Sequence, residues 1–422
     1  MRKRLLIASM LVVAACLGGG AAHAQDAPRS ARVGDYFTQE EIARAERYRG
    51  PRYALGFTAL GLSTLVLFLI GGGRGARWLG DWTSSLTGAR WWLQAILLSI
   101  AVIVLQALVT LPFGLLRHRQ DRRFGLATNT VPEYLTDWLK ANLVQIAISA
   151  IAAVLFVGVA RALPRAWPVA AAAVGAALTI ALVYLFPVVY EPLFNTFEPV
   201  DQAQRERVLA VADRAGVRVN DVLVADASRR TTRQNAYVSG LGNSRRVVLY
   251  DTLLAKSSPR QVDLVVAHEL GHVKHNDVVR GTLLGVVGII AGIIVLRVLL
   301  GSGVVMSWAG ASGPGDARIV PFLALFMAVS SLLTMPVANA YSRSQEASAD
   351  RFALDVTGDV GTAISVEVDL ARDSISDLTP NPFVRWMFFT HPPTMERIRA
   401  SIAYAREHDL PVPPTTGPSA SP

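Results

Sequence analysis

Six long apolar stretches alternate with polar segments along this chain of 422 residues. Most of them approach or exceed 18 residues with few charges, which is the length that an α-helix needs to cross a bilayer. The pattern therefore predicts a mostly helical, polytopic membrane protein. The stretches lie at residues 53–73, 91–116, 143–163, 167–190, 281–300 and 319–340.

The first 24 residues form a further apolar segment with the features of a secretory leader. MRKR is basic, LLIASMLVVAAC is apolar, and Ala22-His23-Ala24 fits a small-residue cleavage site before Gln25. The same segment also fits an uncleaved first membrane helix. The two interpretations predict six and seven spans respectively.

Between residues 191 and 280 the pattern changes to that of a small α/β domain inserted between membrane helices. DQAQRERVLAVADRAG has helical spacing and ends at Gly216, and VLVAD, NAYVSG and RRVVLY read as short strands. We divide the chain into the leader or first helix, an N-terminal membrane domain, a second domain that includes the spans at 281–300 and 319–340, and a Pro/Ser/Thr-rich disordered tail. Their bounds are 1–24, 25–190, 191–410 and 411–422.

Composition supports the membrane assignment and limits the chemistry. The chain is 52% hydrophobic and 17% charged, with a formal net charge of +9. Excess basic residues in a membrane protein usually lie in short loops beside the spans, and no basic patch is interleaved with aromatics, so we expect no nucleic-acid partner. Cys16 is the single cysteine, so a metal site in the body of the chain must use His, Asp and Glu.

The segment before AHELGHVKHND (267–277) has the features of a helix start. Ser258 suits the N-cap, Pro259 suits the first helical position, and Gln261 suits the capping-box position. A helix that starts there places His268 and His272 one turn apart on one face, where both imidazoles can bind one ion.

Glu269 follows the first histidine, about 100° further round the helix. From there it can reach a water molecule on the metal without being a ligand. Two histidine ligands and a glutamate base are the arrangement of the HExxH motif of zinc hydrolases.

A catalytic zinc ion needs a third protein ligand, and SRSQEASAD (342–350) offers one. Glu346 and Asp350 lie one helical turn apart after the stretch 319–340. Two predicted spans separate them from HELGH, so both segments return to one face of the membrane. We assign Glu346 as the third ligand and Asp350 as a carboxylate that orients a ligand histidine; a surface charge pair would also explain Asp350.

HELGH, ExxxD after two spans and HPPTMERI at 391–398 together resemble the type I CAAX prenyl proteases, which are integral-membrane zinc metalloproteases. The resemblance covers roughly residues 35 to 405. It extends to RRFGLATNTVPEYLTDWLKANL (122–143), YEPLFNTFEPV (190–200) and RQNAYVSGLGNSRRVVLYDTLL (233–254).

The resemblance implies that His268, His272 and Glu346 bind one Zn²⁺. It implies that Glu269 activates water and passes the proton to the leaving amine. It also implies that seven membrane helices surround a chamber that the catalytic domain closes at one end, although a cleaved leader would leave six.

The family pattern also implies how a peptide or protein substrate binds. The edge strand that begins with Asn235, Ala236 and Tyr237 would pair with an extended peptide. His391 and Arg397 would stabilise the oxyanion or position the substrate. By its residues alone, HPPTMER is equally a turn that caps the last helix.

Loop charges favour a cytoplasmic catalytic domain in a bacterial inner membrane, whereas a cleaved leader followed by strict alternation would put that domain outside. A monomer surrounded by membrane lipid is compatible with the sequence. A quality-control protease of the heat-shock kind and a non-enzymatic zinc-binding membrane protein remain alternatives. The basic residues on the favoured side are Arg29, Arg32, Arg44, Arg47, Arg49, Arg52, Arg117, Arg119, Arg122, Arg123 and Lys140.

Overall fold

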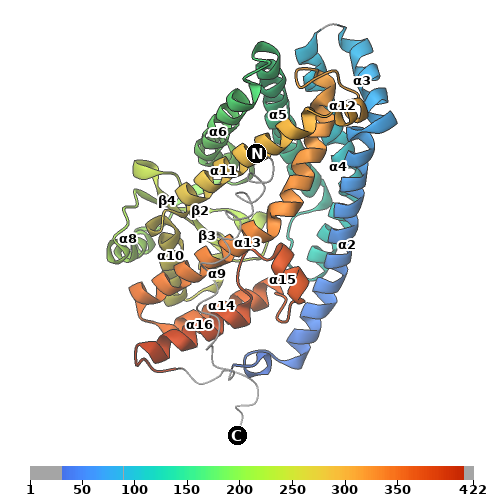
Figure 1. Ribbon diagram of the computed structural model, residues 1–422. Helices are drawn as coiled ribbons and strands as arrows, with labels where there is room; N and C mark the ends of the chain where they lie inside the picture. Colours follow the sequence, from blue (N-terminus) through green and yellow to red (C-terminus); the bar gives the residue numbers. More distant parts are fainter. Residues whose placement is uncertain (1–30, 89, 413–422) are drawn as a thin grey trace.

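A computed structural model describes residues 31–88 and 90–412. Long helices form an elongated bundle, and a small sheet with shorter helices lies at one end of it (Figure 1). The leader or first helix predicted at 1–24 lies outside the described residues, as does the tail from residue 413. The α/β character predicted for 191–280 is confirmed.

The described residues contain six helices that are long and apolar enough to cross a membrane, one for each predicted stretch. They are α2 (Gln39–Gly71), α4 (Trp91–Arg123), α5 (Val131–Ala162), α6 (Trp167–Leu185, continued through a π-helical turn at Phe186–Tyr190 into α7, Glu191–Phe194), α11 (Asp277–Leu300) and α13 (Val320–Thr357). The short helices α3 (Gly73–Thr87) and α12 (Gly303–Ala309) pack together at the end of the bundle far from the sheet.

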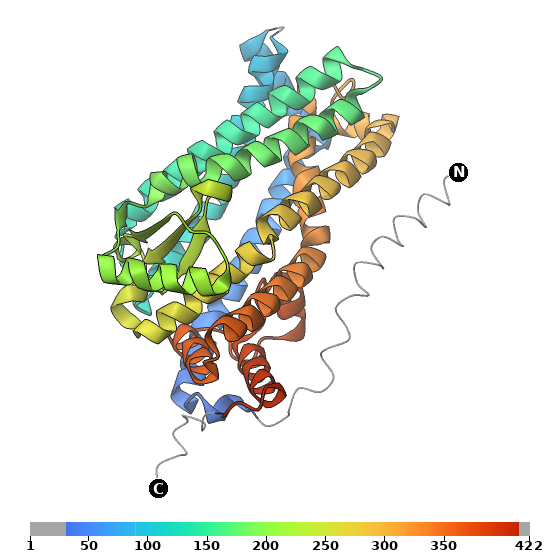
Figure 2. The ribbon, with the colours of Figure 1, turned by 90° about the vertical axis from the view of Figure 1, so that its left-hand side faces the viewer.

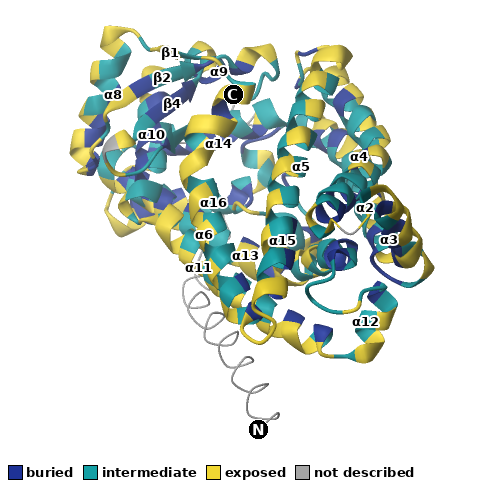
Figure 3. Ribbon diagram, turned by 90° about the horizontal axis from the view of Figure 1, so that it is seen from above, coloured by how far each residue is buried: buried dark blue, intermediate teal, exposed yellow. Residues whose placement is uncertain are grey.

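The outer faces of these helices are apolar and unpacked. Leu69 of α2 is 56% exposed, and so is Leu108 of α4. Figure 3 shows exposed residues along the outer faces of the long helices, whereas buried residues concentrate in β2, β4 and α10. Apolar surface on this scale is stable in contact with lipid tails rather than water.

Several spans extend well beyond their apolar stretches, toward the sheet end of the bundle. Helix α2 begins 14 residues before residue 53, and its Arg49 donates through Nε to the carbonyl of Ile375, 2.6 Å away. The loop between α4 and α5 forms a β-bridge from Ala127 to Thr231. Both polar regions therefore lie on the same side as the catalytic domain, as alternation of the spans predicts.

The sheet has four strands in the order β1-β2-β4-β3. β2 (Asp221–Ala225) and β4 (Arg246–Tyr250) are parallel, whereas β1 (Phe197–Pro199) and β3 (Ala236–Ser239) pair antiparallel at the two edges. β1 was not predicted, because three residues that include a proline give no alternation to detect. Among the described strands β3 therefore has a free edge.

The helices of the catalytic domain cover this sheet and continue into the bundle. Figure 2 shows the sheet and its helices gathered at one end of the long spans. The core of this domain includes Val247 and Leu249 of β4 and Leu270 of the metal helix. The helices are α8 (Gln202–Ala215), α9 (Asp251–Lys256), α10 (Pro259–Lys274), α14 (Val360–Ser374), α15 (Pro382–Phe388) and α16 (Thr394–Glu407).

A cavity of about 4040 Å³ lies between α4, α5, α6, α11 and α13. Its walls in the bundle are mostly apolar, for example Val102, Leu178 and Phe326. Toward the catalytic domain the lining becomes polar and includes Asp350 and Arg397. An internal space thus extends from the membrane bundle to Asp350 and Arg397, next to the predicted ligands.

Candidate metal centre

Helix α10 starts where the sequence predicts. Ser258 is the N-cap, its hydroxyl accepts from the backbone N–H of Gln261, and the Gln261 side chain accepts in return from the Ser258 N–H. The cap sets the register of the helix. His268 and His272 consequently point from one face of α10 toward α13.

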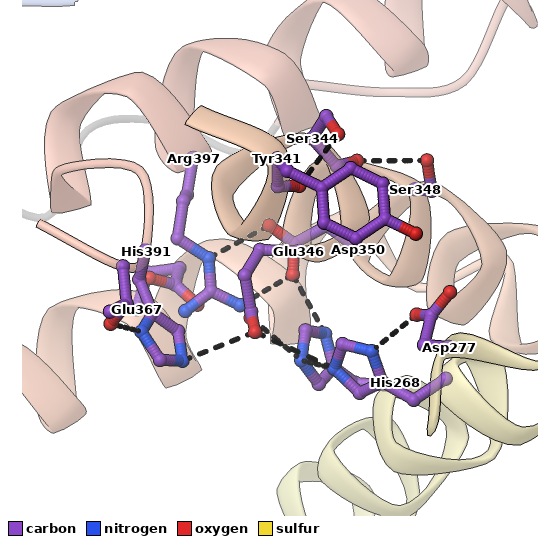
Figure 4. A network of polar contacts seen from close by, with 12 residues as sticks. His268, Asp277, Tyr341, Ser344, Glu346, Ser348, Asp350, Glu367, His391 and Arg397 are labelled. Atoms are coloured by element: carbon purple, nitrogen blue, oxygen red, sulfur yellow. Dashed lines mark hydrogen bonds and ion pairs between the residues drawn. The ribbon is translucent and has the colours of Figure 1, made fainter. Parts of the chain in front are cut away.

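The three predicted metal ligands converge. Nε2 of His268 lies 3.3 Å from Nε2 of His272 and 3.3 Å from Oε2 of Glu346, and Nε2 of His272 lies 3.7 Å from Oε1 of Glu346. Figure 4 shows the Glu346 side chain reaching from α13 to the imidazoles on α10. The sequence predicted that two intervening spans bring Glu346 back to the side of HELGH, and the contact between α13 and α10 agrees with that prediction.

These separations fit a metal ion. Ligands of tetrahedral zinc, at bond lengths of about 2.0–2.1 Å, lie about 3.3–3.4 Å from one another. Oε2 of Glu346 is buried and accepts no hydrogen bond in the described part of the chain. Burial opposes a charge on His268, but contacts with Asp350 and Glu346 prevail and raise the pKa of His268 to about 10. The cluster thus has the electrostatic character of a cation site.

Both histidines present their other ring nitrogen to a carboxylate. Nδ1 of His268 lies 2.9 Å from Oδ1 of Asp350, and Nδ1 of His272 lies 2.8 Å from Oδ2 of Asp277. The hydrogen bond to Asp277 holds the proton on Nδ1 of His272 and leaves its Nε2 as the ligand atom. For His268 the contact with Asp350 is an ion-pair distance rather than an aligned hydrogen bond. When a metal ion takes the place of the proton on Nε2, the two Nε2 atoms, 3.3 Å apart, can both direct a lone pair at that ion.

Glu269 follows His268 on α10, where its charge interacts with both ligand imidazoles. Its side chain makes no hydrogen bond or ion pair within residues 31–88 and 90–412. Burial raises the pKa of the Glu269 carboxyl, and the imidazoles of His268 and His272 partly offset that effect. A buried carboxylate without a partner, next to the metal ligands, has both the room and the basicity to take a proton.

The guanidinium of Arg397 binds two carboxylates, whereas the family pattern implies that it contacts the oxyanion or the substrate. Its Nε donates to Oδ2 of Asp350 at 2.8 Å, its Nη2 binds the other oxygen of Asp350, and its Nη1 lies 2.8 Å from Oε1 of Glu367. Burial opposes the charge, but Glu367 and Asp350 hold the pKa of Arg397 above its ordinary value. The arginine supports Asp350 from behind, so we treat it as a positioning residue.

His391 lies at the open side of the cluster. Its Nε2 is 3.3 Å from Oε1 of Glu346, its Nδ1 is 2.9 Å from the hydroxyl of Thr390, and 60% of its side chain is exposed. It follows α15, whose last carbonyls are bound by Arg343 and Asn339 of α13. An exposed imidazole beside the ligands can donate to a group that binds at the cluster.

The free edge of β3 borders the same helix, because α10 packs against β3. The N–H of Tyr250 binds the carbonyl of Asn235, and the register then alternates, so that Tyr237 and Ser239 face β4. The backbone of Ala236 and Val238 therefore points to the open edge. The Asn235 side chain is exposed and makes no hydrogen bond among the described residues.

Two carboxylates of the site were missing from the sequence analysis. Asp277 lies five residues after His272, which ends HELGH, and its position at the start of a membrane helix was a usable signal. Glu367 is buried in α14 and contacts Arg397. Nothing in the sequence around Glu367 marks it, because its partner lies thirty residues further along the chain.

Two family models together match most of the chain. Residues 21–196 match the CAAX prenyl protease N-terminal model, described by five membrane helices, and residues 199–404 match peptidase family M48. The chain belongs to the type I CAAX prenyl protease family. Members of this family are membrane metalloproteases, and the chain is one.

Individual family members are similar over most of the chain. An uncharacterized metalloprotease of Bacillus subtilis, YhfN, is 26% identical over 86% of both chains. CAAX prenyl protease 1 of Saccharomyces cerevisiae is 26% identical over 70% of this chain and 69% of its own length. The crystal structure of Ste24p from S. mikatae matches with a TM-score of 0.75 at 22% identity, over 86% of this chain and 89% of that one. This likeness shows that the fold is shared.

Proposed function

We propose that the chain is a zinc-dependent endopeptidase that cleaves peptides at the cluster of His268, His272 and Glu346. The observation that carries the proposal is the convergence of these three ligand atoms next to a buried, unpartnered Glu269. A zinc-storage or sensing role has no need of Glu269.

Each residue of the site has its own role in the proposed reaction. A zinc ion held by the three ligands would polarise the scissile carbonyl and make water nucleophilic at neutral pH. Glu269 accepts the proton of the attacking water and passes it to the leaving amine. His391, exposed beside Glu346, donates to the oxygen on which negative charge develops.

The substrate lies along β3 as an added strand. The outward N–H and C=O groups of Ala236 and Val238 supply backbone pairing without sequence preference. The exposed Asn235 binds the same peptide by its side-chain amide. Backbone pairing of this kind selects an extended conformation, which a folded protein does not offer.

We propose that the substrates are segments of membrane proteins or short hydrophobic peptides. The large cavity has apolar walls in the bundle, and its polar end borders Asp350 and Arg397 beside the cluster; this supports the proposal. The names of the yeast and other relatives refer to CAAX prenyl substrates; the B. subtilis relative carries no substrate in its name. Comparison of peptides in native cells that contain active protein or the Glu269→Gln variant would identify the substrates.

We further propose that the catalytic domain faces the cytoplasm of a bacterial cell. The arginine-rich start of α2 and the loop after α4 both contact the catalytic domain, and positive residues favour the cytoplasmic side. A reporter fused within residues 201–279 tests this orientation, and mass analysis of the N-terminus tests whether the leader is cleaved.

The decisive experiment is Glu269→Gln, with Glu206→Gln on the exposed face of α8 as the control. We expect the first variant to lose peptide cleavage by several orders of magnitude while it keeps about one zinc per chain. Full cleavage by Glu269→Gln would refute the base assignment, and loss of zinc would show that Glu269 is instead needed for metal binding. The control should match the parent in both measurements.

A further inference from the structure

We propose that Asp277, the first residue of membrane helix α11, is a positioning residue that fixes the tautomer and orientation of His272 as a metal ligand. The proposal rests on the proposed zinc site. It assigns a role to a residue outside the HELGH and ExxxD motifs. It also ties the start of a membrane span directly to the metal cluster.

The contact between the two side chains is short and sheltered. Oδ2 of Asp277 lies 2.8 Å from Nδ1 of His272, and only 9% of the Asp277 side chain is exposed. Since Nδ1 donates to this carboxylate, Nε2 is the nitrogen that carries the free lone pair. That is the nitrogen 3.3 Å from His268 and 3.7 Å from Glu346. Figure 4 shows the Asp277 carboxylate at the edge of the cluster, joined by a dashed line to an imidazole nitrogen.

The turn between α10 and α11 brings Asp277 to this place. Helix α10 ends at Lys274, and Asn276 adopts φ 57° and ψ 39°, a left-handed conformation that asparagine tolerates better than most residues. The chain thereby turns within two residues, and α11 begins at Asp277. The side chain folds back onto the last turn of α10, where His272 lies.

The two carboxylates that contact the ligand histidines differ in their other partners. Asp350 contacts His268 and also binds Arg397 through both of its oxygens. For Asp277, His272 is the one hydrogen-bond or ion-pair partner within the described part of the chain. The charge of Asp277 therefore acts on His272 without competition, whereas an arginine balances that of Asp350.

A carboxylate in this position makes the imidazole a stronger ligand and holds its ring in the plane that metal binding needs. Loss of such a partner typically lowers metal affinity about 10- to 100-fold. An acidic first residue also favours a helix start through the macrodipole. A role limited to the helix start would change stability but leave metal affinity unaltered, so the two roles can be separated.

The test measures zinc affinity of the full-length protein by competition with a chromophoric chelator, for the parent, Asp277→Ala, Asp277→Asn and Asp201→Ala. Asp201 is the control because it caps helix α8 and forms no hydrogen bond or ion pair with a metal ligand in the described part of the chain. We expect about a 10- to 100-fold weaker affinity for Asp277→Ala. Asp277→Asn should weaken affinity less, because its amide oxygen still accepts from Nδ1. Asp201→Ala should lower the unfolding midpoint and leave affinity at the parent value.

Equal zinc affinity for the parent and both Asp277 variants would overturn the role of Asp277 while leaving the zinc site intact. A parent protein that binds no zinc would overturn the proposed function as well. Cobalt substitution provides a second measurement on Asp277→Asn, which keeps the size of the side chain. A shift of its visible absorption bands relative to the parent supports the role, and identical bands contradict it.

Discussion

Nη1 of Arg397 lies 2.8 Å from Oε1 of Glu367, behind the carboxylate that supports His268. One guanidinium thereby joins α16 to α14 and, through Asp350, to α13. All three helices contribute to the wall of the metal centre. A buried arginine between two carboxylates is a rigid support whose loss leaves charges unpaired.

The first prediction concerns the pH dependence of stability. Burial raises the pKa of Glu367 from an ordinary 4.5 to about 7. The folded state therefore binds more protons than the unfolded state between these values, and the free energy of unfolding falls as pH rises through that range. Each pKa unit is worth about 1.4 kcal/mol, so the change is on the order of a few kcal/mol.

Glu367→Gln should remove this dependence. We expect its unfolding midpoint, measured in detergent, to change less between pH 5 and pH 8 than that of the parent. Asp369→Asn, at a more exposed position of the same helix, is the control and should follow the parent. If the unfolding midpoint of Glu367→Gln changed with pH as much as that of the parent, a group other than Glu367 would bind the proton.

The second prediction tests the close approach of α10 and α13 at Gly271. A Cβ at this position would lie 3.1 Å from Cα of Ala349 and 3.2 Å from the ring of Phe352. Gly271→Val should push α13 away, separate Glu346 from the histidines and cost about 1–3 kcal/mol. Zinc content and the unfolding midpoint report both effects. Gly281→Val, which meets nothing within 4 Å, should leave zinc content unchanged.

The third prediction tests the substrate edge. Val238→Pro removes an N–H that points away from β4, so the sheet ladder stays intact. We expect KM for an extended peptide to rise at least about tenfold, as one or more backbone hydrogen bonds are lost. Val238→Ala keeps the N–H and should bind as the parent does. Tyr237→Pro removes an N–H that faces β4, so it should break the sheet ladder and unfold this edge. Equal KM values for Val238→Pro and the parent would exclude strand pairing at this edge.

The fourth prediction concerns His391. Its alanine variant should lower kcat about 10²- to 10³-fold with a smaller change in KM, since removal of one oxyanion donor has effects of that size. Zinc should stay bound, because the imidazole is not among the three converging ligands. His408→Ala, at the end of α16, is the control. Loss of zinc in His391→Ala would instead make His391 a ligand.

The sequence by itself determined the elements that depend on local pattern. Apolar stretches of sufficient length predicted the six spans, and the cap at Ser258 predicted where α10 starts. Helical spacing then placed His268 and His272 on one face. Counting spans brought Glu346 to the same side, because a helix that crosses the membrane must end on the opposite face.

Apart from Asp350, only the tertiary structure decided which side chains support that site. Arg397 meets Asp350 and Glu367 across 47 and 30 positions of sequence, and no local periodicity encodes such pairs. The outward register of Ala236 and Val238 depends on the pairing of β3 with β4. Asp277 was visible as the first residue of a span, but its contact with His272 follows from the left-handed turn at Asn276. Partners of this kind are set by packing in three dimensions, whereas the ligand spacing is set by the helix alone.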